Sequence, residues 1–370
     1  MDDFERLVLS GEPRERGRRH GEAFAGAVAD NVECYQRKFT YEGVDLEAAR
    51  EQAVDYLDVI EAEVPAYAEE MRGIADGSGV ALAEIALLNV RWEVIYPAWG
   101  TSEEDGERSS TEAGVPADGC TSVGVTPPAT ADGRTYVGQN WDWLASVADN
   151  LLLVERRRED GPDSLAMTEA GIVGGKIGLN EAGIGLCVNG LMSAADGENP
   201  YQLPYHARFY QLLAADRFDE ALCAILEGDR VGSANVLVGD VDGEVIDLEA
   251  SPHRVEAIYP EDGLLTHGNH FESDAAESAG LAEVASSLYR APRLRKLLAA
   301  ERGAIDPATI QDALQDHFGQ PASICKHVDT SLPELEYGQT NASFVLDLAG
   351  RRLLATRGPP CRSEYREYTL

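Results

Sequence analysis

Residues 118–122 read Asp-Gly-Cys-Thr-Ser and mark an abrupt change in the composition of the chain. The residues before them, 101–118 (TSEEDGERSSTEAGVPAD), hold six acids, one base and almost no large apolar side chain. Such a segment cannot bury enough surface to order itself. Gly119 lacks a Cβ, so the thiol of Cys120 can approach the Gly119 carbonyl. We therefore predict an exposed acidic loop that ends at a cleavage point between Gly119 and Cys120.

A cysteine inside a chain is usually an unreactive core thiol, and Cys120 has to be judged by its context. Cleavage after Gly119 would make Cys120 a new N-terminus. Its α-amino group, with a reference pKa of ~7.7–8, could then act as the base for its own thiol. The other cysteines lack these surroundings and are expected to be inert: Cys34, Cys187, Cys223, Cys325 and Cys361.

The chain before Gly100 is predicted to be largely helical. Apolar residues recur every three or four positions between Val54 and Ile74, with Pro65 restarting the helix, and residues 11–30 and 82–94 also favour helices. After Cys120 short alternating runs separated by glycine turns predict antiparallel strands, with helices at Tyr205 to Leu226, Ser286 to Ala300 and Ile310 to His317. The expected strands are Thr121 to Val125, Arg134 to Trp141, Leu151 to Arg157, Ile184 to Val188, Asn235 to Val238, Glu244 to Leu248, Arg254 to Ile258, Ser343 to Asp347 and Arg352 to Ala355. This order predicts an α+β fold with helices packed on antiparallel sheets.

The charge of the chain excludes several classes of function. A net charge of −34 repels phosphates and anionic membrane surfaces, so we expect neither a nucleic acid nor a membrane as partner. The acidic N-terminus, without an apolar signal segment, predicts a cytoplasmic protein with reduced thiols. A surface rich in acids and poor in lysine resembles that of proteins from halophilic archaea, although an ordinary acidic protein is the alternative.

Several motifs follow Cys120 in a fixed order. They are Gly119-Cys120-Thr121-Ser122, Gly138-Gln139-Asn140-Trp141-Asp142-Trp143, Gly178-Leu179-Asn180-Glu181-Ala182-Gly183, Cys187-Val188-Asn189-Gly190, His267-Gly268-Asn269-His270-Phe271 and Ser286-Ser287-Leu288-Tyr289-Arg290. With these motifs the chain resembles the penicillin acyltransferase-like cysteine branch of the N-terminal-nucleophile (Ntn) hydrolases, from about Gly11 to the C-terminus. The resemblance implies a four-layer αββα sandwich of antiparallel sheets. It also implies self-cleavage into a helical chain, 1–119, and a catalytic chain, 120–370, which together form one domain.

The resemblance also implies roles for five residues. Cys120 is similar to the family's nucleophile, and Asp142 to the carboxylate that holds the nucleophile's amino group, although a strand-end cap is the alternative for Asp142. Asn269 resembles the side-chain donor of the oxyanion hole, and Asn189 the residue whose backbone N–H completes it, although Asn-Gly alone would indicate a turn. Arg290 resembles the active-site arginine, which would favour the thiolate.

Two other interpretations and one absence accompany these assignments. Arg293 lies one helical turn from Arg290 and could be confused with it. His267 and His270 have the separation of two metal ligands, but no third ligand stands at a convincing spacing, so no metal is expected there. No phosphate-binding glycine loop follows a strand, and no cofactor is expected.

The sequence therefore predicts a self-processing cysteine amidohydrolase or acyltransferase that cleaves a linear amide, such as an N-acyl amino acid or a peptide-like compound, through a thioester. Its partners would be a small-molecule amide, an amine or acyl-CoA as a second substrate, and the two cleaved chains for each other. The alternatives are a non-processing Ntn-fold binding or scaffold protein, or an enzyme that uses Cys120 uncleaved with His267 or His270 as the base.

Overall fold

The computed structural model describes residues 3–100, 119–279, 281 and 284–370. The predicted acidic loop, 101–118, lies outside the described residues. The described residues before Cys120 form one strand and six helices: β1 (Arg6–Leu9), α1 (Pro13–Ala23), α2 (Ala25–Tyr41), α3 (Leu46–Glu63), α4 (Pro65–Ser78), α5 (Leu82–Asn89) and α6 (Arg91–Gly100). The prediction that the described part of the N-terminal segment is largely helical is confirmed.

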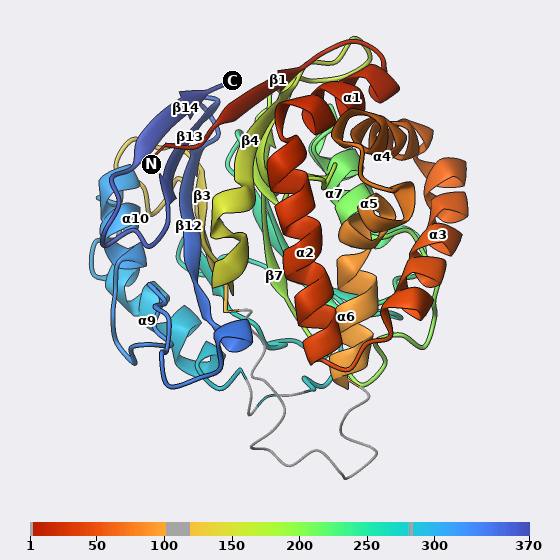
Figure 1. Ribbon diagram of the computed structural model, residues 1–370. Coiled ribbons are helices and arrows are strands. Elements are labelled where there is room, and N and C mark those ends of the chain that lie inside the picture. The colour runs from red at the N-terminus through yellow and green to blue at the C-terminus, as the bar shows by residue number, and fades with distance from the viewer. Residues whose placement is uncertain (1–2, 101–118, 280, 282–283) are drawn as a thin grey trace.

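Two sheets lie face to face at the centre of the molecule (Figure 1). The eight-stranded sheet has the order β1-β4-β5-β6-β7-β8-β9-β10, and the six-stranded sheet the order β11-β2-β3-β12-β13-β14. The remaining strands are β2 (Thr121–Val125), β3 (Tyr136–Leu144), β4 (Leu151–Arg156), β5 (Ser164–Glu169), β6 (Ile177–Asn180), β7 (Ile184–Gly190), β8 (Ala234–Asp240), β9 (Val245–Ala250), β10 (Val255–Ile258), β11 (Leu264–His267), β12 (Gly338–Asp347), β13 (Arg352–Arg357) and β14 (Arg366–Thr369).

Helices cover the outer side of each sheet, which gives four layers. In Figure 1 α1 to α6, together with α7 (Tyr205–Leu212), lie on the side of the eight-stranded sheet. Helix α8 (Phe218–Leu226) packs against α7 and β8. The opposite side of the molecule carries α9 (Ser287–Ala299) and α10 (Pro307–Leu314), which pack on β2, β3, β11 and β12. The predicted α+β fold, a four-layer αββα sandwich, is confirmed.

Two details differ from the prediction. The pair β1 and β4 is parallel, whereas all the other strand pairs between the described residues are antiparallel. A parallel pair needs a long crossover. Here the crossover contains the six N-terminal helices and the β2–β3 hairpin.

The helix predicted from Tyr205 to Leu226 is divided into α7 and α8, because the chain leaves the helical conformation between Leu212 and Phe218.

The sandwich places the β2–β3 hairpin in the interior. All residues of Thr121–Val125 and of Tyr136–Leu144 are buried, because the other sheet covers one face of these strands and α9 and α10 cover the opposite face. Buried on both faces, the hairpin gives rigid support to any group at its end. Among the described residues, no helix has the length and apolar composition that crossing a membrane requires.

Candidate active site

Cys120 lies directly before β2, at the end of the hairpin. Its side chain is buried, with 3% of the residue exposed, and its Sγ donates to the backbone carbonyl of Asp142 at 3.7 Å. Asp142 is on β3, whose Asn140 is the register partner of Thr121. The pairing of the two strands therefore brings the Gly119-Cys120 motif beside the Trp141-Asp142-Trp143 motif.

Arg290 forms hydrogen bonds to the peptide that is predicted to be cleaved. Its Nη1 donates to the carbonyl oxygen of Gly119, to that of Cys120 at 2.5 Å, and to Thr121 Oγ1 at 2.7 Å. The guanidinium is 1% exposed and comes from α9, which packs on β2. A cation at the Gly119 carbonyl is placed to stabilise negative charge on that oxygen if a nucleophile adds to its carbon.

Asp142 also lies close to Gly119 and Cys120. Its Oδ1 accepts a hydrogen bond from Thr340 Oγ1 at 2.6 Å, and it is fully buried. A Cβ added to Gly119 would lie 3.1 Å from Asp142 Oδ2 and 3.0 Å from Lys326 Nζ. A carboxylate and an ammonium group therefore approach the α-carbon of the residue before Cys120, and a larger residue there would displace them.

The two candidate oxyanion residues lie around Cys120 from different strands. Asn269, which follows β11, accepts from Arg290 Nη2 at 2.7 Å and donates through Nδ2 to the Gly190 carbonyl at 3.1 Å. Asn189 on β7 accepts from Ser122 Oγ at 2.8 Å through its side chain, so it contacts β2 from the opposite sheet. Hydrogen bonds thus fix the Asn269 side chain in advance, which is the condition for preorganised stabilisation of charge.

A small cavity of about 10 Å³, with room for about one water molecule, lies beside Cys120. Its lining is aromatic and cationic: Arg91, Trp92, Tyr96, Cys120, Trp141, Trp143, Lys176, Val188 and Gly190. Arg91 and Lys176 share one carboxylate, Glu169, which Arg91 Nη2 contacts at 2.9 Å. Burial, with Arg91 nearby, holds the pKa of Lys176 well below its usual value, while Cys120 acts in the opposite direction. The Glu169 carboxylate therefore offsets positive charge beside the cavity.

The histidines near the site are already engaged. His267 Nε2 contacts Glu249 Oε1 at 2.7 Å, and its Nδ1 contacts the Gly268 carbonyl at 3.0 Å. Burial lowers the pKa of His267, but the carboxylates of Asp247 and Glu249 outweigh it and raise that pKa to about 9. Both ring nitrogens of His267 face acceptors, so the ring is held protonated and is a poor candidate for a general base.

His270 is engaged on one side. Its Nδ1 lies 2.7 Å from Ser287 Oγ, and the same hydroxyl accepts from the Asn269 N–H at 2.6 Å. The tautomer of His270 decides which of the two groups donates, and in either case Nδ1 is engaged with this hydroxyl. This arrangement supports the Asn269 backbone, and it argues against His270 Nδ1 as a proton acceptor for the thiol.

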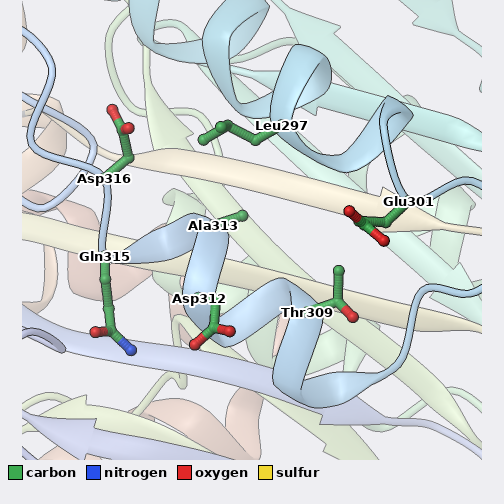
Figure 2. A pocket seen from close by; sticks show the side chains of 7 residues that line it. All are labelled: Leu297, Glu301, Thr309, Asp312, Ala313, Gln315 and Asp316. Carbon is green, nitrogen blue, oxygen red and sulfur yellow. The ribbon is translucent and has the colours of Figure 1, made fainter.

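Arg293 has different surroundings from Arg290. It forms two 2.6 Å hydrogen bonds, from Nε and from Nη2, to the carboxylate of Asp316. Asp316 lies at the edge of an open groove of about 480 Å³ between α9 and α10, which Figure 2 shows. Acidic side chains, Glu301, Asp312 and Asp316, line much of this groove, and none of the predicted catalytic residues does. The geometry thus favours Arg290 as the active-site arginine.

The structure brings together Cys120, Asp142, Asn269 and Arg290, and Asn189 contacts the nearby Ser122 from the opposite sheet. Sequence analysis missed five further residues of the same site: Arg91, Glu169, Lys176, Lys326 and Thr340. Only Lys176 carried a signal, because it is one of few lysines in the chain and stands in a run of glycines and apolar residues. The others come from distant segments whose proximity no local pattern reports.

Comparisons with known proteins identify the family of the chain. The sequence model of the family described as acyl-coenzyme A:6-aminopenicillanic acid acyl-transferase matches residues 129–353, well over half of the chain. The chain belongs to this acyltransferase family. The match begins after Cys120, so it does not itself include the candidate nucleophile.

A curated relative and several solved structures are also similar. The acyl-coenzyme A:6-aminopenicillanic-acid-acyltransferase 40 kDa form of Emericella nidulans is 29% identical over 358 residues, which are 96% of this chain and 92% of the relative. A variant of conjugated bile acid hydrolase from Clostridium perfringens is 14% identical with a TM-score of 0.45, covering 67% of this chain and 97% of that one. Penicillin V acylase from Agrobacterium tumefaciens is 14% identical with a TM-score of 0.44, covering 64% and 82%.

Proposed function

We propose that the chain is a self-processing cysteine Ntn amidohydrolase or acyltransferase, which cleaves a linear amide through a thioester on Cys120. The observation that carries this proposal is the hydrogen bond from Arg290 to the Gly119 carbonyl, directly before a buried cysteine. Buried arginines elsewhere in the chain, Arg208 and Arg230, also donate to backbone carbonyls, so the proposal rests on which carbonyl Arg290 contacts. A donor fixed at the oxygen directly before Cys120 would stabilise the oxyanion that forms there during cleavage.

Maturation would proceed in two steps, an acyl shift from nitrogen to sulfur and a hydrolysis. The Sγ of Cys120 adds to the Gly119 carbonyl carbon, the C–N bond to Cys120 breaks, and the thiol proton passes to the Cys120 nitrogen. Water then adds to the thioester carbon, the C–S bond breaks, and the products are a Gly119 carboxylate, a free thiol and a free α-amine. Arg290 would stabilise the oxyanion in both steps through its contact with the Gly119 oxygen.

Turnover would use the groups that cleavage exposes. The new α-amine would accept the thiol proton, and Asp142, whose Oδ2 approaches the Gly119 α-carbon, would hold the resulting ammonium. The side chain of Asn269 and the backbone N–H of Asn189 would donate to the oxyanion of the substrate, each worth ~3–4 kcal/mol in comparable sites. The leaving amine takes up the proton, and water or a second amine releases the acyl group from the thioester.

The cavity holds about one water molecule, so the class of amide is proposed from the residues of its wall and not from its size. A carboxylate on the amine half of the substrate, as an N-acyl amino acid or a peptide-like compound carries, would have to compete with Glu169 for Arg91. Tryptophans 141 and 143 offer apolar surface for the acyl chain. In the transferase case acyl-CoA would supply the acyl group and an amine would accept it, as the name of the Emericella nidulans relative states for that protein.

Denaturing mass spectrometry of the purified full chain tests maturation. We expect two masses, for residues 1–119 and 120–370, which sum to the mass of the precursor plus one water. The two chains should remain associated in native buffer.

Three variants test the assigned roles. Cys120→Ala should stay a single chain and show no turnover, because it lacks the nucleophile. Asp142→Asn should reduce turnover severely while it keeps the fold. Cys223→Ala, on the exposed side of α8, is the matched control and should behave as the wild type.

Two results would contradict the proposal. A single chain that persists after long incubation in high salt would favour the binding or scaffold protein, or the enzyme with an uncleaved cysteine. Amidase activity in Cys120→Ala, on any substrate that the wild type cleaves, would exclude Cys120 as the nucleophile.

A further inference from the structure

Four metal-binding side chains converge at a second place in the fold, outside the candidate active site. His317, Cys325 and His327 lie on the loop between α10 and β12, and Cys361 on the turn between β13 and β14. One ligand atom of each lies within 4.8 Å of the others. We propose that this Cys₂His₂ quartet binds a zinc ion.

The contacts around His327 are the strongest argument. Its Nε2 lies 3.1 Å from His317 Nε2, 3.4 Å from Cys361 Sγ and 3.7 Å from Cys325 Sγ. A neutral imidazole nitrogen carries either one hydrogen or one lone pair, so it cannot satisfy three such neighbours. A shared cation can, because every ligand then directs its lone pair to the ion.

The distances also fit the geometry of zinc. With Zn–N near 2.0–2.1 Å and Zn–S near 2.3 Å, the ligand atoms of a tetrahedral site lie roughly 3.3–3.8 Å apart. The three separations from His327 Nε2, 3.1–3.7 Å, are close to this range, and all four ligand atoms lie within 4.8 Å of one another. Two thiolates and two neutral imidazoles balance the charge of Zn²⁺, and binding would release the two thiol protons to solvent. Four protein ligands close the coordination shell, which is typical of a structural site.

The position of the quartet indicates what it would hold in place. Lys326, between two of the ligands, donates its backbone N–H to Thr340 Oγ1 at 2.8 Å, and its carbonyl accepts from the Thr340 N–H at 3.1 Å. Thr340 in turn donates to Asp142. Zinc would therefore join the α10–β12 loop to the C-terminal hairpin and fix the segment that carries Lys326 beside Gly119. His317 is exposed, so the ion can enter from solvent.

Metal analysis of the full chain tests the site. After incubation with zinc under reducing conditions and gel filtration, we expect about one zinc per chain by elemental analysis. Replacement by Co²⁺ should give the strong visible bands of a tetrahedral site and a thiolate-to-cobalt charge-transfer band. Cys361→Ser should weaken zinc binding by more than about 100-fold and reduce the charge-transfer band. Cys223→Ser, an exposed cysteine on α8, should change neither.

A second variant covers the case in which Cys361→Ser does not fold. His317→Asn removes an exposed ligand, so it should fold and still lose zinc affinity, whereas His253→Asn, on another exposed loop, should not. Absence of bound zinc in the reduced wild-type chain would overturn the proposal. So would equal zinc content in His317→Asn and the wild type, or a Cys325–Cys361 disulfide in protein purified under reducing conditions. Measured in Cys120→Ala, metal content does not depend on self-cleavage, so this test and that of the proposed function can fail separately.

Discussion

Two arginines one helical turn apart on α9 show how strongly local surroundings decide the role of a residue. Arg290 is buried and donates to two backbone carbonyls, a threonine hydroxyl and Asn269. Arg293 is partly exposed and pairs with Asp316. The planar, forked guanidinium of Arg290 serves several acceptors at once, and the single ammonium of a lysine could not reproduce that geometry.

We therefore predict different effects of the same substitution at these two positions. Arg290→Lys should slow self-cleavage by roughly 10²–10³-fold, the usual effect of removing an oxyanion donor. Arg293→Lys should leave the cleavage rate within about twofold and reduce stability by less than about 1 kcal/mol, because its ion pair is partly exposed. The rate is measured by the appearance of the 120–370 chain over time, with circular dichroism to check the fold. Equal rates for the two variants would refute the role of Arg290.

The sequence was informative where a residue type and its direct neighbours carry the chemistry. Gly119-Cys120 and Trp141-Asp142-Trp143 could be recognised from their motifs, and strand pairing then brings them together. The metal quartet could not be recognised, because Cys361 lies 34 residues after His327 and meets it only through the fold. Cys325 and Cys361 were expected to be inert, but the structure places both beside two imidazoles.

At the scale of elements, α1 and α4 cross at very short distance. A Cβ on Gly17 of α1 would lie 2.0 Å from the Glu70 carbonyl oxygen, and a Cβ on Gly73 of α4 would lie 2.1 Å from the Arg14 carbonyl oxygen. Each helix thus presents glycine where the backbone of the other approaches. Gly26, on an exposed position of α2, has nothing within 4 Å of such a Cβ apart from its chain neighbours and the backbone of its own helix.

These surroundings predict opposite effects for two substitutions of glycine by alanine. Gly17→Ala should reduce the free energy of unfolding by about 1–3 kcal/mol, because the backbone of α4 has to move. Gly26→Ala should increase it by about 0.5–1 kcal/mol, because alanine has the higher helix propensity and nothing obstructs it. Denaturant unfolding in the Cys120→Ala background, which keeps one chain, measures both. A Gly17→Ala protein as stable as the wild type would mean that the helices do not cross so closely.

Elements with clear local signals were predicted, and those that depend on packing were not. The strand expected at Thr121 to Val125 coincides with β2. The break between α7 and α8 was missed, because residues 213–217 (LAADR) contain neither glycine nor proline to mark it. Strand β5 was missed as well: Ser164–Glu169 has a single β-branched residue, and it is buried because β4 and β6 pair on either side of it.

At the scale of the whole molecule, the distribution of lysine is unusual. The chain has four lysines, and of these Lys38 and Lys176 are each only 1% exposed, while Lys296 is exposed and Lys326 half-buried. The positive charge at the surface is therefore carried almost entirely by arginine, among a large excess of acids. The lysines that remain lie mostly where the structure uses them, and this supports our proposal that the surface is adapted to high salt.

We accordingly predict that salt stabilises the protein. With a net charge of −34 in one compact body, self-repulsion opposes folding in dilute buffer, and molar salt shortens the screening length to about 3 Å. Salt also weakens the surface arginine–acid pairs, but each exposed pair contributes only about 0–1 kcal/mol, so relief of the net repulsion should dominate. Thermal melts of Cys120→Ala from low to molar potassium chloride should show a Tm that rises steadily. A parallel series in sucrose is the control. Sucrose is uncharged and is excluded from the protein surface, so it shows how much of the rise in Tm is due to solute exclusion and not to charge screening. A Tm that stays constant or falls up to molar potassium chloride would exclude salt adaptation.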